Sequence, residues 1–117
     1  MNNQEFLGRT HALREHAKNL LHSKNAKYAG NYNPIHNFEI GAAINGSTTA
    51  QTAWGYMTKH LVALQDMVKR NDFSDLPDLL EKCTDITNYI AFIYAIGIDE
   101  NEKLTQKGSE SNDQCHA

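Results

Sequence analysis

Eight consecutive residues near the end of the chain, from Tyr89 to Ile96, are apolar. They continue a helical pattern that begins near Pro77, and a helix that is apolar on nearly every side must be buried on several sides. In a chain of 117 residues, either the other helices wrap around this one or a second subunit covers it. We expect a homo-oligomer formed through this C-terminal helix, because four helices can barely enclose one of their own.

Three earlier segments also have helical apolar spacing. We predict a first helix over about 4–24, a short second helix that is capped by Asn33 and ends at Asn45-Gly46, and a third over about 48–70. Thr48-Thr49-Ala50-Gln51 fits the capping box. The apolar stripe of the first helix is expected to contain Phe6, Leu13, Ala17, Leu20 and Leu21. That of the third is expected to contain Trp54, Met57, Leu61, Leu64 and Val68.

The sequence thus predicts an all-α protein with one four-helix bundle over residues 1–98, whose fourth helix ends near Ile96. Residues 99–117 are polar and mixed in charge, and we expect them to be disordered. The net charge of -3 argues against duplex nucleic acid as a partner. No apolar run is long enough for a membrane span and no signal peptide is evident, so we expect a cytoplasmic protein without a membrane partner. The two cysteines form neither a disulfide framework nor a zinc motif.

Chemistry-bearing residues are dense in Asn33-Pro34-Ile35-His36-Asn37-Phe38-Glu39, where the second helix begins. His36 and Glu39, three residues apart, share one face of a helix. Taken alone, these residues have simpler explanations, which are helix capping or turn formation for Asn33, His36 and Asn37 and a solvated surface for Glu39. Their density supports a second interpretation, in which this short helix contributes to a binding site.

A second cluster lies on the fourth helix. Glu81 and Asp85 are one turn apart, and Asn88 and Tyr89 follow one turn later. A solvated acidic edge is the alternative interpretation. Here, however, the pair leads into the most apolar run of the chain, where an unpaired charge is costly.

The third cluster is Lys59-His60, in the middle of the third helix. The lysine ammonium can neutralise a phosphate as a point charge, or it can extend into water. The histidine can bind a ligand or be a hydrogen-bonded structural residue.

If the three clusters converge, their carboxylates and amides favour magnesium over zinc. We therefore predict that Glu39, Glu81 and Asp85 are catalytic and bind magnesium. A metal-bound water would then attack a phosphoanhydride. The nucleotide itself would be held by a larger polar set: Asn33, His36, Asn37, Lys59, His60, Asn88 and Tyr89.

Four short motifs follow one another within residues 24–96: Lys27-Tyr28, Asn37-Phe38-Glu39, Lys59-His60 and Asp85-Ile86-Thr87-Asn88-Tyr89. Their order resembles the MazG-like superfamily of all-α nucleoside triphosphate pyrophosphohydrolases, and more closely its small phage-type, nucleotide-modification-associated proteins. The resemblance implies a site built from more than one subunit, with magnesium held by an ExxE and an ExxD pair. This chain has His36-x-x-Glu39 and Glu81-x-x-x-Asp85 instead, which predicts weaker metal binding.

Three functions follow as hypotheses. The first is a phage-type nucleotide-binding enzyme, a magnesium-dependent nucleotide pyrophosphohydrolase. The second is a non-catalytic, anti-defence protein that sequesters a nucleotide, including a cyclic nucleotide immune signal, in the host cytoplasm. The bases of the sequestered nucleotide would stack on aromatic residues of the protein: Tyr28, Tyr32, Trp54 and Tyr89. The third is an interaction module in which the polar clusters only stabilise an oligomer.

Overall fold

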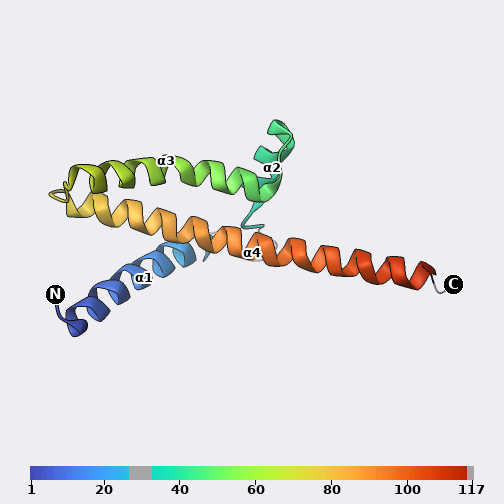
Figure 1. Cartoon of the computed structure of the whole chain (residues 1–117), viewed down its shortest axis with the longest axis horizontal. Coiled ribbons are helices and arrows are strands. Elements are labelled where there is room, and N and C mark those ends of the chain that lie inside the picture. Colours follow the sequence, from blue (N-terminus) through green and yellow to red (C-terminus); the bar gives the residue numbers. More distant parts are fainter. Residues whose placement is uncertain (27–32, 116–117) are drawn as a thin grey trace.

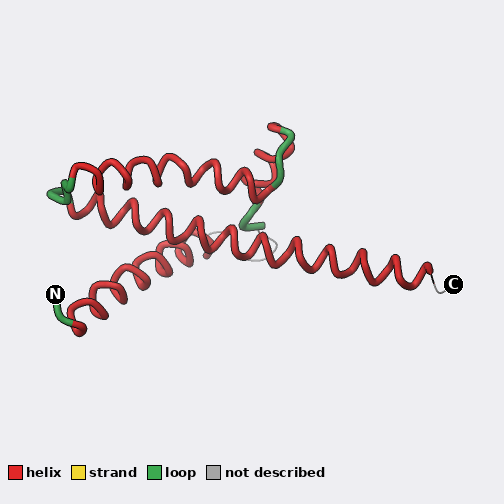
Figure 2. Tube along the Cα trace, viewed as in Figure 1, coloured by secondary structure: helices red, strands yellow, loops and turns green. Residues whose placement is uncertain are grey.

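The computed structural model describes the backbone of residues 1–26 and 33–115, and the side chains of residues 1–24 and 33–108. These residues form four α-helices, and no strand occurs among them (Figure 2). The helices are α1 (Asn3–Ala26), α2 (His36–Asn45), α3 (Thr49–Arg70) and α4 (Leu76–Cys115). The predicted all-α class and four helices packed as a bundle are confirmed.

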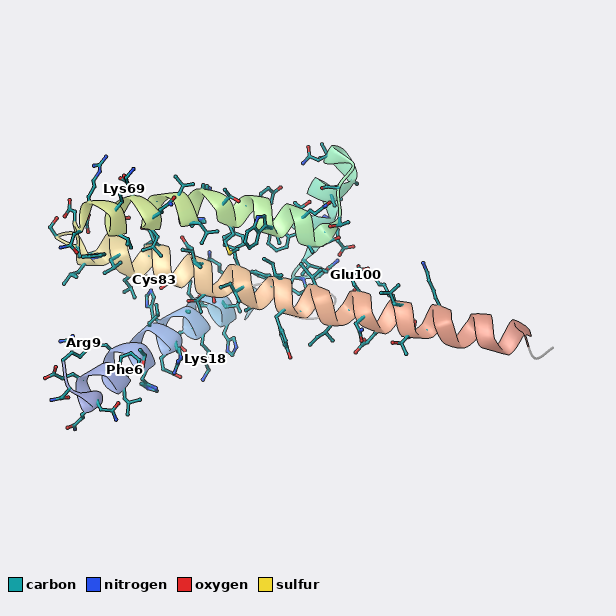
Figure 3. All side chains as sticks on the ribbon, viewed as in Figure 1. Phe6, Arg9, Lys18, Lys69, Cys83 and Glu100 are labelled. Atoms are coloured by element: carbon teal, nitrogen blue, oxygen red, sulfur yellow. The ribbon has the colours of Figure 1, made fainter. Side chains whose placement is uncertain are left out.

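Helix α4 lies at the centre of the arrangement, with α3 along one side and α1 on the other (Figure 1). α3 and α4 form an antiparallel pair joined by a short turn, and α2 packs across the start of α3. α1 approaches α4 with its C-terminal half and diverges toward its N-terminus, where Phe6 stays exposed (Figure 3). Of the predicted stripe of this helix, Ala17 is buried against α4.

Local sequence signals explain most helix ends. Thr48 accepts a hydrogen bond from the Gln51 amide over 3.1 Å, and the Gln51 side chain accepts one from the Thr48 amide over 2.9 Å, which confirms the capping box. Gly46 ends α2 in the left-handed conformation, with φ of 65°. Asn33, in contrast, is not the cap of α2. Its side chain accepts from the Ile35 amide, and this turn delays the helix until His36.

The largest core cluster joins α2, α3 and α4. Phe38, Ala53 and Ile96 are buried in it, and Tyr89 and Phe92 pack around them. The predicted apolar stripe of α3 is partly wrong, since Met57 is buried but Trp54 and Val68 are exposed. The small residues Thr52 and Ala53 take the inner positions instead. Small side chains let the helix backbones approach closely. A search for large apolar residues at helical spacing overlooks a buried face made of small ones.

The contact between α2 and α3 is tightest at Gly41. A Cβ atom at this position would lie 2.8 Å from Thr52 Cγ2 and 2.8 Å from the Tyr56 hydroxyl oxygen. The Thr52 hydroxyl is itself fixed, because it lies within 3.1 Å of both the Thr48 carbonyl oxygen and Ser47 Oγ. Thr52 therefore has little freedom to move away from a larger residue at position 41.

Helix α4 is longer than predicted. It continues through Cys115 rather than ending near Ile96, and it extends past the other helices (Figure 1). Every side chain from Gly97 to Gly108 is exposed. Lys103 pairs with Asp99 over 3.1 Å and with Glu100 over 3.5 Å, at the spacings that support a helix locally. The predicted end of the helix is therefore wrong. The division into a domain of residues 1–98 and a disordered tail of residues 99–117 stays a prediction.

Among the residues whose structure is described, none of the helices combines the length and the apolar character that crossing a membrane requires.

Alanine substitutions at two glycines provide a test of the packing between α2 and α3. Gly41→Ala forces the contact with Thr52 and Tyr56, and overpacking of this kind costs about 1–3 kcal/mol, against about 1 kcal/mol gained from helix propensity. Gly55→Ala meets no atom within 4 Å, so only the gain remains. We expect urea unfolding to give a lower stability for the first variant and a higher stability for the second. Equal stabilities would contradict the close approach at Gly41.

Candidate functional site

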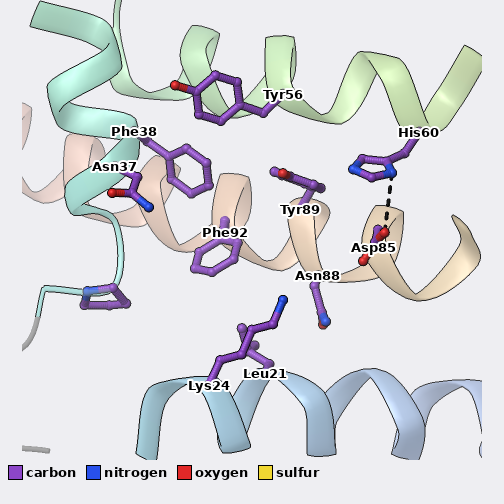
Figure 4. Close-up of a pocket in the computed structure, with 11 residues that line it drawn as sticks. Leu21, Lys24, Asn37, Phe38, Tyr56, His60, Asp85, Asn88, Tyr89 and Phe92 are labelled. Carbon is purple, nitrogen blue, oxygen red and sulfur yellow. Dashed lines mark ion pairs between the residues drawn. The ribbon is translucent and has the colours of Figure 1, made fainter. Parts of the chain in front are cut away.

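A pocket lies where α1, α2, α3 and α4 come together (Figure 4). Its volume is about 400 Å³. Aromatic, amide, acidic and basic side chains share its surface. The lining residues are Leu21, Lys24, Pro34, Asn37, Phe38, Tyr56, His60, Asp85, Asn88, Tyr89 and Phe92.

Aromatic rings form one wall of this pocket. The Phe38 ring lies 5.2 Å from Phe92, 5.7 Å from Tyr56 and 6.1 Å from Tyr89, measured between ring centroids. The tilted and edge-to-face angles are those that aromatic pairs prefer. Phe38 is buried beneath its neighbours, while Tyr56 is still exposed. The wall therefore offers π-faces and ring edges to a planar ligand.

A histidine and a carboxylate pair with each other at the far end of the same pocket. His60 Nδ1 lies 3.4 Å from Asp85 Oδ2, and both side chains are largely buried. The imidazole also lies against Tyr89, with ring centroids 5.5 Å apart and an angle of 33° between planes. His60 is thus fixed on two sides, by a charge or hydrogen-bond partner and by a ring (Figure 4). Such a pair can exchange a proton with a ligand or hold a ligand's polar edge.

Helix α1 contributes the third wall. Asn88 on α4 donates a hydrogen bond from Nδ2 to the Ala17 carbonyl oxygen over 3.2 Å, which ties the two helices together. This contact fixes α1 so that Leu21 and Lys24, one and two turns later, line the pocket. The Lys24 ammonium extends toward α4 (Figure 4). A flexible cation at a partly apolar pocket can neutralise an anionic group.

The pocket also changes the acidity of Tyr89. Burial raises the pKa of the Tyr89 phenol, and the negative charge of Asp85 and the neighbouring Tyr56 act in the same direction. The phenol therefore stays protonated and remains available as a hydrogen-bond donor at neutral pH.

The structure brings together half of the residues that the sequence predicted for nucleotide binding and catalysis. Asn37, His60, Asp85, Asn88 and Tyr89 all line this pocket. The remaining predicted residues do not line it and are exposed: Asn33, His36, Glu39, Lys59 and Glu81.

The three predicted magnesium ligands lie in different places. Glu39 accepts a hydrogen bond from Asn33 Nδ2 over 2.6 Å and faces a separate hollow that Asp99 also lines. Glu81 is exposed on α4, and only Asp85 lines the main pocket. Within residues 1–26 and 33–115, no group of three or more histidine, cysteine, aspartate or glutamate residues is placed to hold a metal ion. A magnesium site made by these three residues stays a prediction.

Sequence reasoning missed several lining residues, above all Lys24 and Tyr56. Lys24 is a cation that the structure places at the pocket, whereas Lys59 is exposed and does not line it. Basic residues are common in the last turn of a helix because they interact favourably with the helix dipole. Lys24 therefore did not by itself suggest a binding site. Phe38 lies within the polar segment that was singled out, but the sequence did not identify it as the centre of an aromatic wall. The predicted roles of Tyr28 and Tyr32 lie outside the described residues.

Comparisons of the chain with protein-family profiles, with curated proteins and with solved structures gave no significant match. The MazG-like resemblance therefore stays a prediction that rests on the motifs themselves.

The raised pKa of Tyr89 predicts a loss of stability at alkaline pH. An unfolded tyrosine ionises near pH 10.0, whereas the folded chain still holds its proton there. The unfolded state is therefore favoured increasingly as the pH rises through 10.0, until the folded phenol also ionises. Urea unfolding gives the free energy of unfolding at about pH 9 and at about pH 11. This free energy should fall less between the two pH values for Tyr89→Phe than for the original chain. Identical losses would contradict a perturbed Tyr89.

Proposed function

We propose that the pocket binds a nucleotide. One observation carries the proposal: the aromatic wall around Phe38 and the charged and amide groups of Lys24, Asp85 and Asn88 face a single hollow of about 400 Å³. A nucleotide combines the same three features, which are a planar base, a polar sugar and an anionic phosphate. The volume lies within the range of about 300–1,000 Å³ that is usual for small-molecule sites.

The base fits the aromatic wall. Stacking on an aromatic side chain contributes about 1–3 kcal/mol per base, and it tolerates different bases. The exposed face of Tyr56 and the ring of Tyr89 are the available partners. The Asn37 amide at the edge of this wall can both donate and accept hydrogen bonds, and so can select among base edges.

The phosphate fits the wall made by α1. Lys24 supplies a positive charge there, and the Asn88 side chain lies beside it. Asp85 and His60 occupy the opposite side, between α3 and α4. Since the Asp85 carboxylate repels a phosphate, we place the phosphate toward Lys24 and the sugar or base toward His60.

Magnesium-dependent hydrolysis is the second proposal, supported by the position of Asp85 and by the MazG-like motifs. Magnesium is commonly held by one or two carboxylates together with substrate phosphates and water. Asp85 is the predicted ligand that lies inside the pocket, and a bound nucleotide would supply the phosphate oxygens. The MazG-like fold and assembly through the C-terminal helix belong to this proposal as well.

A thermal-shift panel tests nucleotide binding directly. The purified chain is heated with each common nucleoside mono-, di- and triphosphate and with cyclic mono- and dinucleotides, with and without magnesium. A ligand at a hundred times its dissociation constant should stabilise the fold by about 2.7 kcal/mol. Chromatography of the supernatant then distinguishes the alternatives, because intact ligand indicates sequestration and released phosphate or pyrophosphate indicates hydrolysis. No shift with any nucleotide would refute the proposal.

Lys24→Met provides a residue-level test, with Lys18→Met as its control. Hydrogen bonds to a charged group contribute about 1.5–3 kcal/mol, so removing the Lys24 ammonium should weaken binding about 10- to 100-fold. Lys18 lies on the same helix and is exposed, and it pairs with Glu15 at 3.8 Å. Isothermal titration with the nucleotide that gives the largest thermal shift measures both constants. Equal affinities in the two variants would contradict the placement of the phosphate.

A further inference from the structure

The side of α4 that faces away from α1 and α3 is rich in exposed apolar side chains. Ile90 and Tyr94, in the middle of the helix, are 56% and 71% exposed. The inner faces of α4 use other residues: Tyr89 and Ile96 pack toward α2 and α3, and Asn88 contacts α1. The outer face is therefore separate from the surfaces that build the pocket.

Residues on this side recur at alternating steps of four and three along four heptads; seven of the nine are exposed, and Cys83 and Thr87 are half-buried. We call the following set the α4 seam: Leu76, Leu80, Cys83, Thr87, Ile90, Tyr94, Gly97, Asn101 and Leu104. This is the spacing of the a and d positions of a coiled coil. None of these residues is charged. Uncharged residues over so many turns on the outer side of a helix are unusual for a surface that stays in water.

The chain also exposes more surface than a compact monomer of its mass. A monomer of 13.2 kDa is expected to expose about 6,400 Å², whereas this chain exposes 8944 Å². The difference, about 2,500 Å², exceeds the roughly 800 Å² that each partner buries in a standard protein interface. The radius of gyration of 18.7 Å likewise exceeds the about 13 Å expected for a compact chain of this length.

The extension of α4 beyond Ile96 also needs a partner to be stable. From Gly97 to Gly108 all its side chains are exposed, and a solitary helix of this size is only marginally stable in water. The seam continues into the extension through Gly97, Asn101 and Leu104. A partner helix that follows the seam would therefore stabilise the extension as well as cover the apolar middle.

We propose that a second copy of this chain covers the α4 seam, so that two α4 helices pack along it. The seam is complementary to itself: its apolar residues can interdigitate, and Gly97 lets two backbones approach closely. Asn101, at an a position, finds a polar partner most simply in another copy of the same helix, which is the known use of a buried asparagine in setting register. This inference rests on the assembly through the C-terminal helix proposed above and names the residues that would form it, and its test measures mass, not nucleotide binding or hydrolysis.

Sedimentation equilibrium under reducing conditions tests the proposal with two matched variants. Ile90→Glu places a charge in the seam, whereas Val62→Glu places the same charge on the outer face of α3, at a residue of similar exposure, 58%. The original chain and Val62→Glu should sediment above the 13.2 kDa of one subunit. Ile90→Glu should dissociate at least about 100-fold more readily, since an unpaired charge in an interface is strongly unfavourable.

Tyr94→Lys repeats the test at the most exposed seam residue in the middle of α4, where a substitution leaves the packing of the single subunit intact. Circular dichroism of each variant verifies that the helices are retained. The proposal is overturned if the original chain sediments as a monomer up to about 100 µM. It is also overturned if both seam variants keep the mass of the original chain, or if Val62→Glu dissociates and Ile90→Glu does not.

Discussion

The packing of Phe38 is the interaction on which the rest of the structure depends. This one side chain leaves the short helix α2 and contacts rings on both α3 and α4, at centroid distances of 5.2 to 6.1 Å. A helix of ten residues is not stable by itself in water. α2 therefore exists because Phe38 is buried and because Gly41 lets its backbone come close to α3. The same ring forms the apolar wall of the pocket, so that core and candidate site share one residue.

Helix α1 is attached to the bundle over only part of its length. It contacts α4 in its C-terminal half, where Ala17 is buried and the Asn88 amide reaches its backbone. Hydrogen bonds of this kind contribute only about 1 kcal/mol net, but they fix direction well. The consequence is functional, because the position of α1 determines whether Lys24 lies at the pocket. A nucleotide bound between Lys24 and the aromatic wall would in turn hold α1 against α4.

Helix α4 has two proposed roles on two different faces, which are to line the pocket and to contact a second copy of the chain. Its inner face supplies Asp85, Asn88 and Tyr89 to the pocket, and its outer face carries the seam. A helix can serve both roles because residues one or two apart point in different directions. The single chain exposes about 2,500 Å² more than a compact monomer of its mass would, and the exposed apolar residues of the seam are part of that surface.

Some features could be predicted from the sequence because local chemistry fixes them. The capping box at Thr48 and the left-handed end at Gly46 depend only on neighbouring residues, as do the apolar periods that indicated four helices. The pairing of His60 with Asp85, and the choice of Lys24 over Lys59 at the pocket, could not be predicted. These depend on which helix faces which, and contacts between distant helices leave no local pattern in the residues that make them. The sequence thus determined that four helices form and where the capped ones end, because those signals are local, whereas only the tertiary structure decided which polar residues share one pocket.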